Sequence, residues 1–162
     1  MRIKEIPDFL PKEDYDLLYY HIITNKSFPW YFQPSRAYKH ESDITQFHFS
    51  HIFLREDVRD SDQIHLVKPI RTKLTMTPII RCNMVLTTYS QEIIKSKFHT
   101  DYKDCKTAIY YLNTCNGYTE FITGEKIYSQ ANKMVIFDSN IMHLGTSTSD
   151  ARCRVVLNIN YK

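Results

Sequence analysis

The chain has 162 residues, of which 43% are hydrophobic and 24% are charged, and its formal net charge is +3. A chain of this length and composition is expected to form one globular domain with a substantial core, which excludes a disordered or fibrous protein. The basic residues are scattered, so the mild positive charge does not predict a nucleic-acid-binding surface.

Two amphipathic segments in the first half of the chain predict helices. The first begins at Pro11, which acidic residues follow, and its apolar residues recur at helical spacing to about Thr24. The second is expected over residues 60–74, where an Asp-Ser-Asp sequence can cap the helix start. Pro69 falls inside this segment and is expected to kink or shorten the helix.

The segment between these helices carries aromatic residues and one clear strand pattern. Residues 28–32 predict a strand entry, and we expect Trp30, Tyr31 and Phe32 to pack in the core or at the end of a barrel. Residues 34–44 are polar and predict a solvated loop. Residues 46–53 alternate between apolar and polar and predict a strand. Alternation places His48 and His51 on opposite faces, so the two cannot bind one metal from a regular strand.

Strand patterns dominate the second half of the chain. Aromatic residues make up 14% of the sequence and only three residues are glycine, a composition that suits packed sheets. Strands are expected over residues 80–89, 106–113, 119–122, 126–128, 133–138 and 152–161. We therefore predict a mainly β fold with supporting α-helices, in which helical residues 1–75 back a barrel or sandwich formed by residues 79–162.

Neither a membrane span nor a disulfide framework is expected. No stretch approaches the roughly 20 apolar residues of a membrane helix, and the N-terminus lacks an apolar signal region. The four cysteines have no zinc-ribbon spacing and lie in or beside predicted strands, so we expect reduced thiols. These features predict a soluble, cytoplasmic protein with no membrane partner.

Three side chains suggest a metal site. His99 and Asp101 are two residues apart, so both point to one side of an extended segment, and His143 follows an apolar strand and a polar turn. Two imidazoles and one carboxylate on one face of a metal form the facial triad typical of non-haem Fe(II) oxygenases. A His-x-Asp sequence also arises by chance in surface turns, so the triplet alone is weak support.

An arginine on the last predicted strand suggests an anion site. Alternation places Arg154 on the same face as Asn158 and Asn160. A buried guanidinium needs an anionic partner, and its two parallel donors match a carboxylate. A dicarboxylate co-substrate would satisfy it, and so would a structural salt bridge. Arg152 lies on the same face and is the alternative anchor.

Taken together, these segments resemble the Fe(II)/2-oxoglutarate-dependent dioxygenases, closest to the prolyl-4-hydroxylase-like branch and its small phage-type members. The resemblance covers about residues 79–161 and rests on His99-x-Asp101, residues 107–113, residues 116–121, His143-x-Gly145 and residues 154–161. It implies a double-stranded β-helix, a jelly-roll or cupin-like barrel. The family often has a second glycine where Tyr118 follows Gly117, so that turn is expected to differ.

The resemblance also assigns roles at the site. It implies that the His-Asp-His residues bind Fe(II) and that Arg154 and Tyr111 bind the distal carboxylate of 2-oxoglutarate. Tyr89 resembles a tyrosine that borders the same pocket. Asn83 shares the face of Tyr89 and is expected to touch the co-substrate or the substrate.

The implied activity is that of an oxygenase that uses Fe(II), 2-oxoglutarate and O2 to hydroxylate an aliphatic carbon, with release of succinate and CO2. A prolyl residue is the leading substrate by analogy, and a small molecule, peptide or protein is the expected partner. The alternatives are another metal enzyme on the same barrel, a non-catalytic metal- or carboxylate-binding barrel that acts as a sensor, and an oxidative demethylase of nucleic acid. The phage-type resemblance suggests a phage-infected host cell as the setting. The sequence does not predict an oligomeric state.

Overall fold

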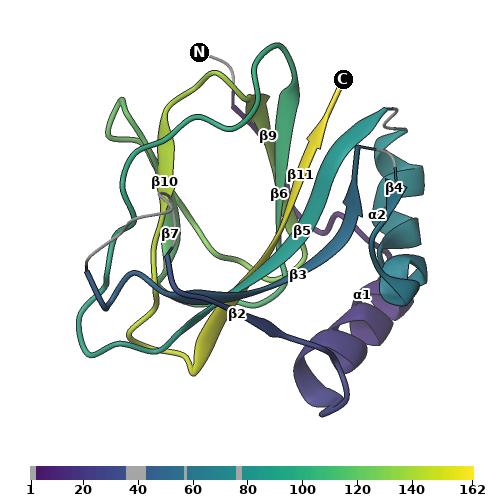
Figure 1. The fold of residues 1–162 in the computed structure, drawn as a ribbon, viewed down its shortest axis with the longest axis horizontal. Helices are drawn as coiled ribbons and strands as arrows, with labels where there is room; N and C mark the ends of the chain where they lie inside the picture. Colours follow the sequence, from purple (N-terminus) through teal and green to yellow (C-terminus); the bar gives the residue numbers. More distant parts are fainter. Residues whose placement is uncertain (1–2, 36–42, 57, 76–77) are drawn as a thin grey trace.

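Two facing antiparallel sheets form the body of the molecule, and helices cover the outer face of the larger sheet (Figure 1). The computed structural model describes residues 3–35, 43–56, 58–75 and 78–162. The described strands place eight strands in the large sheet and three in the small one. This arrangement confirms the predicted double-stranded β-helix.

The large sheet brings together strands from both halves of the chain. Its order is β1 (Lys4–Ile6), β9 (Lys133–Asp138), β6 (Lys106–Tyr111), β11 (Cys153–Tyr161), β5 (Ile79–Thr88), β3 (His48–Arg55) and β2 (Tyr31–Gln33), with β4 (Val58–Arg59) paired to β3. The small sheet has the order β10 (His143–Gly145), β7 (Tyr118–Phe121) and β8 (Lys126–Tyr128). The last long strand, β11, lies between β5 and β6, so it reaches the centre of the large sheet.

The N-terminal helices have less regular ends than their sequence patterns predict. Helix α1 (Lys12–Tyr19) continues directly into a π-helical turn over Tyr20–Thr24. A 3-10 helix over Asp62–Val67 precedes α2 (Lys68–Leu74), in which Pro69 occupies the first turn. A proline in the first turn has no helical hydrogen bond to lose. The proline therefore shortens the α-helical part, as expected, without kinking a helix interior.

None of the helices in the described ranges is long and apolar enough to span a membrane. All six strands expected after residue 79 are present, with ends that move by one or two residues. Strands β1, β4 and β10 were not predicted from the sequence. Each has two or three residues, which is too short for a recognisable alternation of apolar and polar side chains.

Alternation along the central strands separates two apolar layers. One layer packs between the large sheet and the helices and includes Met84, Tyr110 and Leu157. The other lies between the two sheets and includes Ile109 and Val156. The inner face of the large sheet is therefore apolar in part, and its polar members point into the space between the sheets.

The aromatic segment before β3 differs from the prediction. Trp30 packs edge-on against Phe28, which is buried, but Tyr31 and Phe32 are 59% and 60% exposed. Of the two expected locations, the core is therefore wrong for Tyr31 and Phe32. Both lie on β2, which ends the large sheet and has β3 as its partner in the described strand order. Most of the loop expected over 34–44 lies outside the described residues.

Candidate active site

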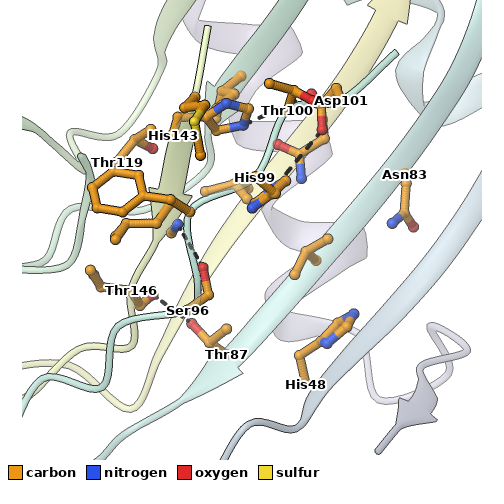
Figure 2. Close-up of a pocket in the computed structure, with 18 of the residues that line it drawn as sticks. His48, Asn83, Thr87, Ser96, His99, Thr100, Asp101, Thr119, His143 and Thr146 are labelled. Carbon is orange, nitrogen blue, oxygen red and sulfur yellow. Dashed lines mark hydrogen bonds and ion pairs between the residues drawn. The ribbon is translucent and has the colours of Figure 1, made fainter. Parts of the chain in front are cut away.

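A reciprocal backbone pair brings the two histidines together. The N–H of His99 donates to the carbonyl of His143 at 3.0 Å, and the N–H of His143 donates back at 2.9 Å. The N–H of Asp101 donates to the carbonyl of Ser139 at 3.2 Å, which holds the carboxylate beside the pair. Ligand atoms of His99, Asp101 and His143 all lie within 4.8 Å of one another (Figure 2).

Both imidazoles are oriented by backbone carbonyls. Nδ1 of His99 lies 3.1 Å from the carbonyl oxygen of Lys97, and Nδ1 of His143 lies 2.9 Å from that of Ile141. A carbonyl oxygen only accepts, so each Nδ1 carries the proton and each Nε2 keeps a lone pair. The two Nε2 atoms each lie 3.9 Å from an oxygen of Asp101. Both lone pairs are thus free to bind a metal, the arrangement that metal-ligating histidines generally have.

The carboxylate of Asp101 is held in its charged form. Its Oδ2 accepts hydrogen bonds from Thr107 on β6 at 2.8 Å and from Asn160 on β11 at 2.9 Å. Burial acts to raise the pKa of Asp101, but His143, Arg81 and these two hydrogen bonds outweigh burial and lower the pKa below its ordinary value. No hydrogen bond to Asp101 Oδ1 is found among the described residues, so this oxygen remains available to a metal.

His143 is held in its neutral form. Its side chain is buried, and burial lowers its pKa, although the nearby Asp101 carboxylate partly offsets this. Metal binding requires a neutral imidazole, so the lowered pKa favours ligation near pH 7.

The donor set fits a divalent metal of the first transition row. Two imidazole nitrogens and one carboxylate oxygen converge in the wall of a cavity of about 680 Å³. This combination, with open positions, is the ligand pattern that suits Fe(II) in oxygenases. The cavity has the size of a small-molecule site.

A buried arginine lies in the wall of the same cavity. Arg154 on β11 is 4% exposed, and its Nε donates to Ser129 Oγ at 2.7 Å. Its Nη2 donates to Thr119 Oγ1 at 3.2 Å, and Nη1 donates to the carbonyl of Thr146 at 3.4 Å. Burial lowers the pKa of this guanidinium. None of these hydrogen-bond partners is acidic, so the charge still lacks an anion.

The remaining residues singled out from the sequence lie in different places. Asn83 on β5 lines the cavity and is 8% exposed. Tyr111 on β6 is fully buried behind the cavity wall, where its hydroxyl donates to Thr119 Oγ1 at 2.8 Å and its ring centre lies 5.5 Å from the Arg154 guanidinium. Tyr111 therefore contacts the anion site through Thr119 and Arg154 and is not among the cavity-lining residues.

The structure bears on two further expectations, the place of Tyr89 at the pocket and the choice between Arg152 and Arg154 as the anchor. Tyr89 was expected to border the pocket, but it is 55% exposed and does not line the cavity. Tyr89 follows the last residue of β5, where its N–H donates to the carbonyl of Arg152 and it forms an isolated bridge with Thr148, so its side chain lies at the end of the sheet and is exposed to solvent. Arg152 precedes β11 and is exposed, whereas Arg154 faces the cavity.

Several cavity residues escaped sequence analysis. Thr119 and Thr146 contact Arg154, and neither has a residue type that identifies an anion site on its own. Arg81 also lines the cavity, as does His48, which the sequence analysis had considered only together with His51 as a metal ligand. Arg81 was detectable, because it lies two residues before Asn83 and therefore shares its face of β5.

No protein-family model and no curated protein matches the sequence. Solved structures do match over nearly the whole chain. A viral collagen prolyl hydroxylase from Paramecium bursaria Chlorella virus-1 is 16% identical, with a TM-score of 0.64, and the match covers 100% of this chain and 97% of the viral enzyme. A prolyl hydroxylase from Trichoplax adhaerens, solved with a hypoxia-inducible-factor peptide, is 15% identical, with a TM-score of 0.67 and coverages of 98% and 82%.

A non-haem α-ketoglutarate-dependent epimerase of nogalamycin biosynthesis is also similar, at 11% identity with a TM-score of 0.66 and coverages of 98% and 77%. The chain thus has the fold of the 2-oxoglutarate-Fe(II) oxygenases, and prolyl hydroxylases are among its structural neighbours. Identities this low establish the shared fold and not a shared substrate.

Proposed function

We propose that this protein is an Fe(II)- and 2-oxoglutarate-dependent oxygenase that hydroxylates an aliphatic carbon of an amino acid or peptide, with a prolyl residue as the first candidate. One observation carries the proposal: the His-Asp-His cluster opens into the same cavity as a buried arginine that has no acidic partner among its hydrogen-bond partners. A metal chelate with a carboxylate at its far end satisfies both features at once.

In this proposal His99, Asp101 and His143 hold the iron. Arg154 binds the distal carboxylate of 2-oxoglutarate through its guanidinium fork, a geometry that a lysine would not reproduce. Thr119 lines the cavity beside Arg154 and offers a hydroxyl to the same anion.

Other residues of the chain orient these groups. Thr107 and Asn160 fix Asp101, and the ring of Tyr111 supports Arg154 from behind. Val156 lies two residues after Arg154 on the inner face of β11 and lines the cavity, so it offers an apolar surface to the methylene chain of the co-substrate. The bound iron, with 2-oxoglutarate and O2, supplies the oxidising power for hydroxylation while the co-substrate becomes succinate and CO2.

The comparisons support an amino-acid or peptide substrate without fixing it. Two structural neighbours are prolyl hydroxylases, and one of those was solved with a peptide. Another neighbour on the same fold is an epimerase, so the fold alone accommodates more than one outcome.

The test is Fe(II)-dependent formation of succinate from 2-oxoglutarate, measured with pools of proline-containing peptides, free amino acids and nucleic acids. We expect one of the first two pools to stimulate succinate formation, and Asp101→Ala to abolish it. Stimulation by nucleic acid alone would favour demethylation. Absence of Fe(II)-dependent succinate in every pool would contradict the proposal.

A further inference from the structure

A second guanidinium lines the cavity, close to the proposed metal ligands. Arg81 lies on β5, and its side chain is 29% exposed. Its Nη2 is 3.8 Å from Asp101 Oδ1, which is too long for a hydrogen bond. The guanidinium lies 5.6 Å from the ring centre of Tyr102, and its buried Nε has no hydrogen-bond partner among the described residues. The donors of Arg81 are therefore largely unused.

Asn83 provides a second unused polar group on the same wall. It lies two residues after Arg81 and shares its face of β5, and both line the cavity. Its side chain is almost fully buried, yet Oδ1 has no hydrogen-bond partner in the described part of the chain. A buried amide oxygen without a hydrogen-bond donor is destabilising unless a ligand supplies that donor. Figure 2 shows Asn83 and His48 on the side of the cavity away from Thr119 and Thr146.

The charge balance leaves Arg81 uncompensated. Asp101 is the only acidic residue among the described residues that line the cavity. In the proposed function, on which this step rests, the charges of iron and Arg154 are balanced by Asp101 and the two carboxylates of 2-oxoglutarate. The positive charge of Arg81 then has no partner, and a single further carboxylate would neutralise it.

We propose that Arg81 binds a carboxylate of the substrate and that Asn83 Oδ1, which can only accept, takes a hydrogen bond from the N–H on the α-carbon of the same substrate residue. Because Arg81 lies 3.8 Å from a proposed metal ligand, that carboxylate would lie only a few bonds from the reacting carbon. This short reach points to the α-carboxylate of the reacting residue itself. The substrate class is accordingly a free amino acid or the C-terminal residue of a peptide, and not an internal residue of a chain.

Two other roles for Arg81 lead to different results. If the arginine only neutralises Asp101, its removal weakens metal binding and leaves the binding of carboxylate compounds unchanged. If it binds 2-oxoglutarate, its removal weakens co-substrate binding. Binding measurements on the protein with metal and co-substrate therefore separate the three roles without relying on turnover.

The experiment is calorimetric titration of the anaerobic Fe(II)·2-oxoglutarate protein with free L-amino acids, with N-acetyl amino acids that mimic a chain terminus, and with the carboxamide of each. We expect at least one carboxylate compound to bind at least tenfold more tightly than its carboxamide. Whether that compound is free or acetylated identifies the source. Arg81→Gln should remove the discrimination and change the Kd of 2-oxoglutarate less than twofold. Arg55→Gln, at an exposed arginine paired with Arg81 in register, should retain it.

The proposal is overturned if every carboxamide binds as well as its acid, if no carboxylate compound binds, or if Arg81→Gln leaves the discrimination intact. It is also overturned if Arg81→Gln acts mainly on Fe(II) or 2-oxoglutarate. Failure of the wild-type protein to bind Fe(II) and 2-oxoglutarate at all would instead contradict the proposed function, so the two failures are distinct.

Discussion

At the residue scale, the buried guanidinium of Arg154 is the feature that a co-substrate best explains. Replacing it with alanine should raise the Kd of 2-oxoglutarate by about 10- to 100-fold, since a hydrogen bond to a charged group contributes about 1.5–3 kcal/mol. Lysine keeps the charge but loses the fork, so Arg154→Lys should recover only part of the affinity. Calorimetric titration of 2-oxoglutarate into the Mn(II)-loaded protein measures the Kd in both variants.

Arg152→Ala is the matched control, because Arg152 lies two residues away and is exposed. The Kd of 2-oxoglutarate in Arg152→Ala should equal that of the wild-type protein. Equal losses in the two alanine variants, or a loss only in Arg152→Ala, would show that the anchor has been assigned to the wrong arginine.

A second residue-scale prediction concerns His51, which is buried among aromatic rings. Its Nδ1 donates to the carbonyl of Pro29 at 2.8 Å, and its Nε2 lies 2.7 Å from the hydroxyl of Ser61. Burial lowers the pKa of His51 below its usual 6.5. The unfolded chain then binds the proton more readily, so this histidine favours folding above pH 6.5 and loses that contribution as the pH falls towards the folded-state pKa.

The free energy of unfolding, measured by urea denaturation in the presence of a chelator, should therefore decrease from pH 7.5 to pH 5. His51→Gln should show a shallower decrease than the wild type, because the variant has no group at this position that titrates in the range. An unchanged slope in His51→Gln would refute the assigned cause.

At the scale of elements, the start of β7 controls the path of the Arg154 side chain. A Cβ added to Gly117 would lie 2.5 Å from the carbonyl oxygen of Ser147 and 2.6 Å from Arg154 Cδ. Gly117→Ala should therefore displace the arginine and weaken 2-oxoglutarate binding at least tenfold, with a smaller effect on metal affinity.

Gly145→Ala is the matched comparison, since its added Cβ would meet Arg154 Nη1 at 3.5 Å, an ordinary contact. Its loss of co-substrate affinity should be much smaller than that of Gly117→Ala. Equal losses would mean that the close approach at Gly117 is not what positions the arginine.

The elements that form the site differed in how well the sequence predicted them. Alternation in β5, β6 and β11 was visible, and it placed Asn83 and Arg154 on inner faces correctly. Strand β10 has only three residues, and its pairing with residue 99 depends on a contact between distant segments. Local patterns carry no information of that kind, so His143 was found through its residue type and its motif.

Tertiary pairing also explains why the side chains of Tyr31, Phe32 and Tyr89 are exposed. Their residue types predict burial, but β2 lies at an edge and Tyr89 lies beyond the end of β5. Which strand ends a sheet, and where a strand leaves it, is decided by tertiary pairing. Residue preference is overridden at such positions.

At the scale of the whole molecule, the metal would connect the two sheets. His143 lies on β10 of the small sheet, while Asp101 is hydrogen-bonded to β6 and β11 of the large sheet. A ligand at 100 times its Kd stabilises the folded state by about 2.7 kcal/mol. For a chain of this size, that should raise the Tm by about 5–10 °C.

Differential scanning calorimetry with and without Mn(II) measures this shift. Asp101→Ala should abolish the shift, and His65→Ala, at an exposed histidine outside the cavity, should retain it. An equal shift in Asp101→Ala and the wild type would mean that the metal binds elsewhere.

The most direct measurement is an anaerobic titration of the protein with Fe(II) and then 2-oxoglutarate, followed by visible absorption. Chelation of protein-bound iron by the co-substrate is expected to give a metal-to-ligand charge-transfer band that saturates at one equivalent. His143→Ala should give no band, and Arg154→Ala should give it only at higher 2-oxoglutarate concentration. A wild-type protein that binds neither ligand, or a band that persists in His143→Ala, would contradict an iron and 2-oxoglutarate site in this cavity.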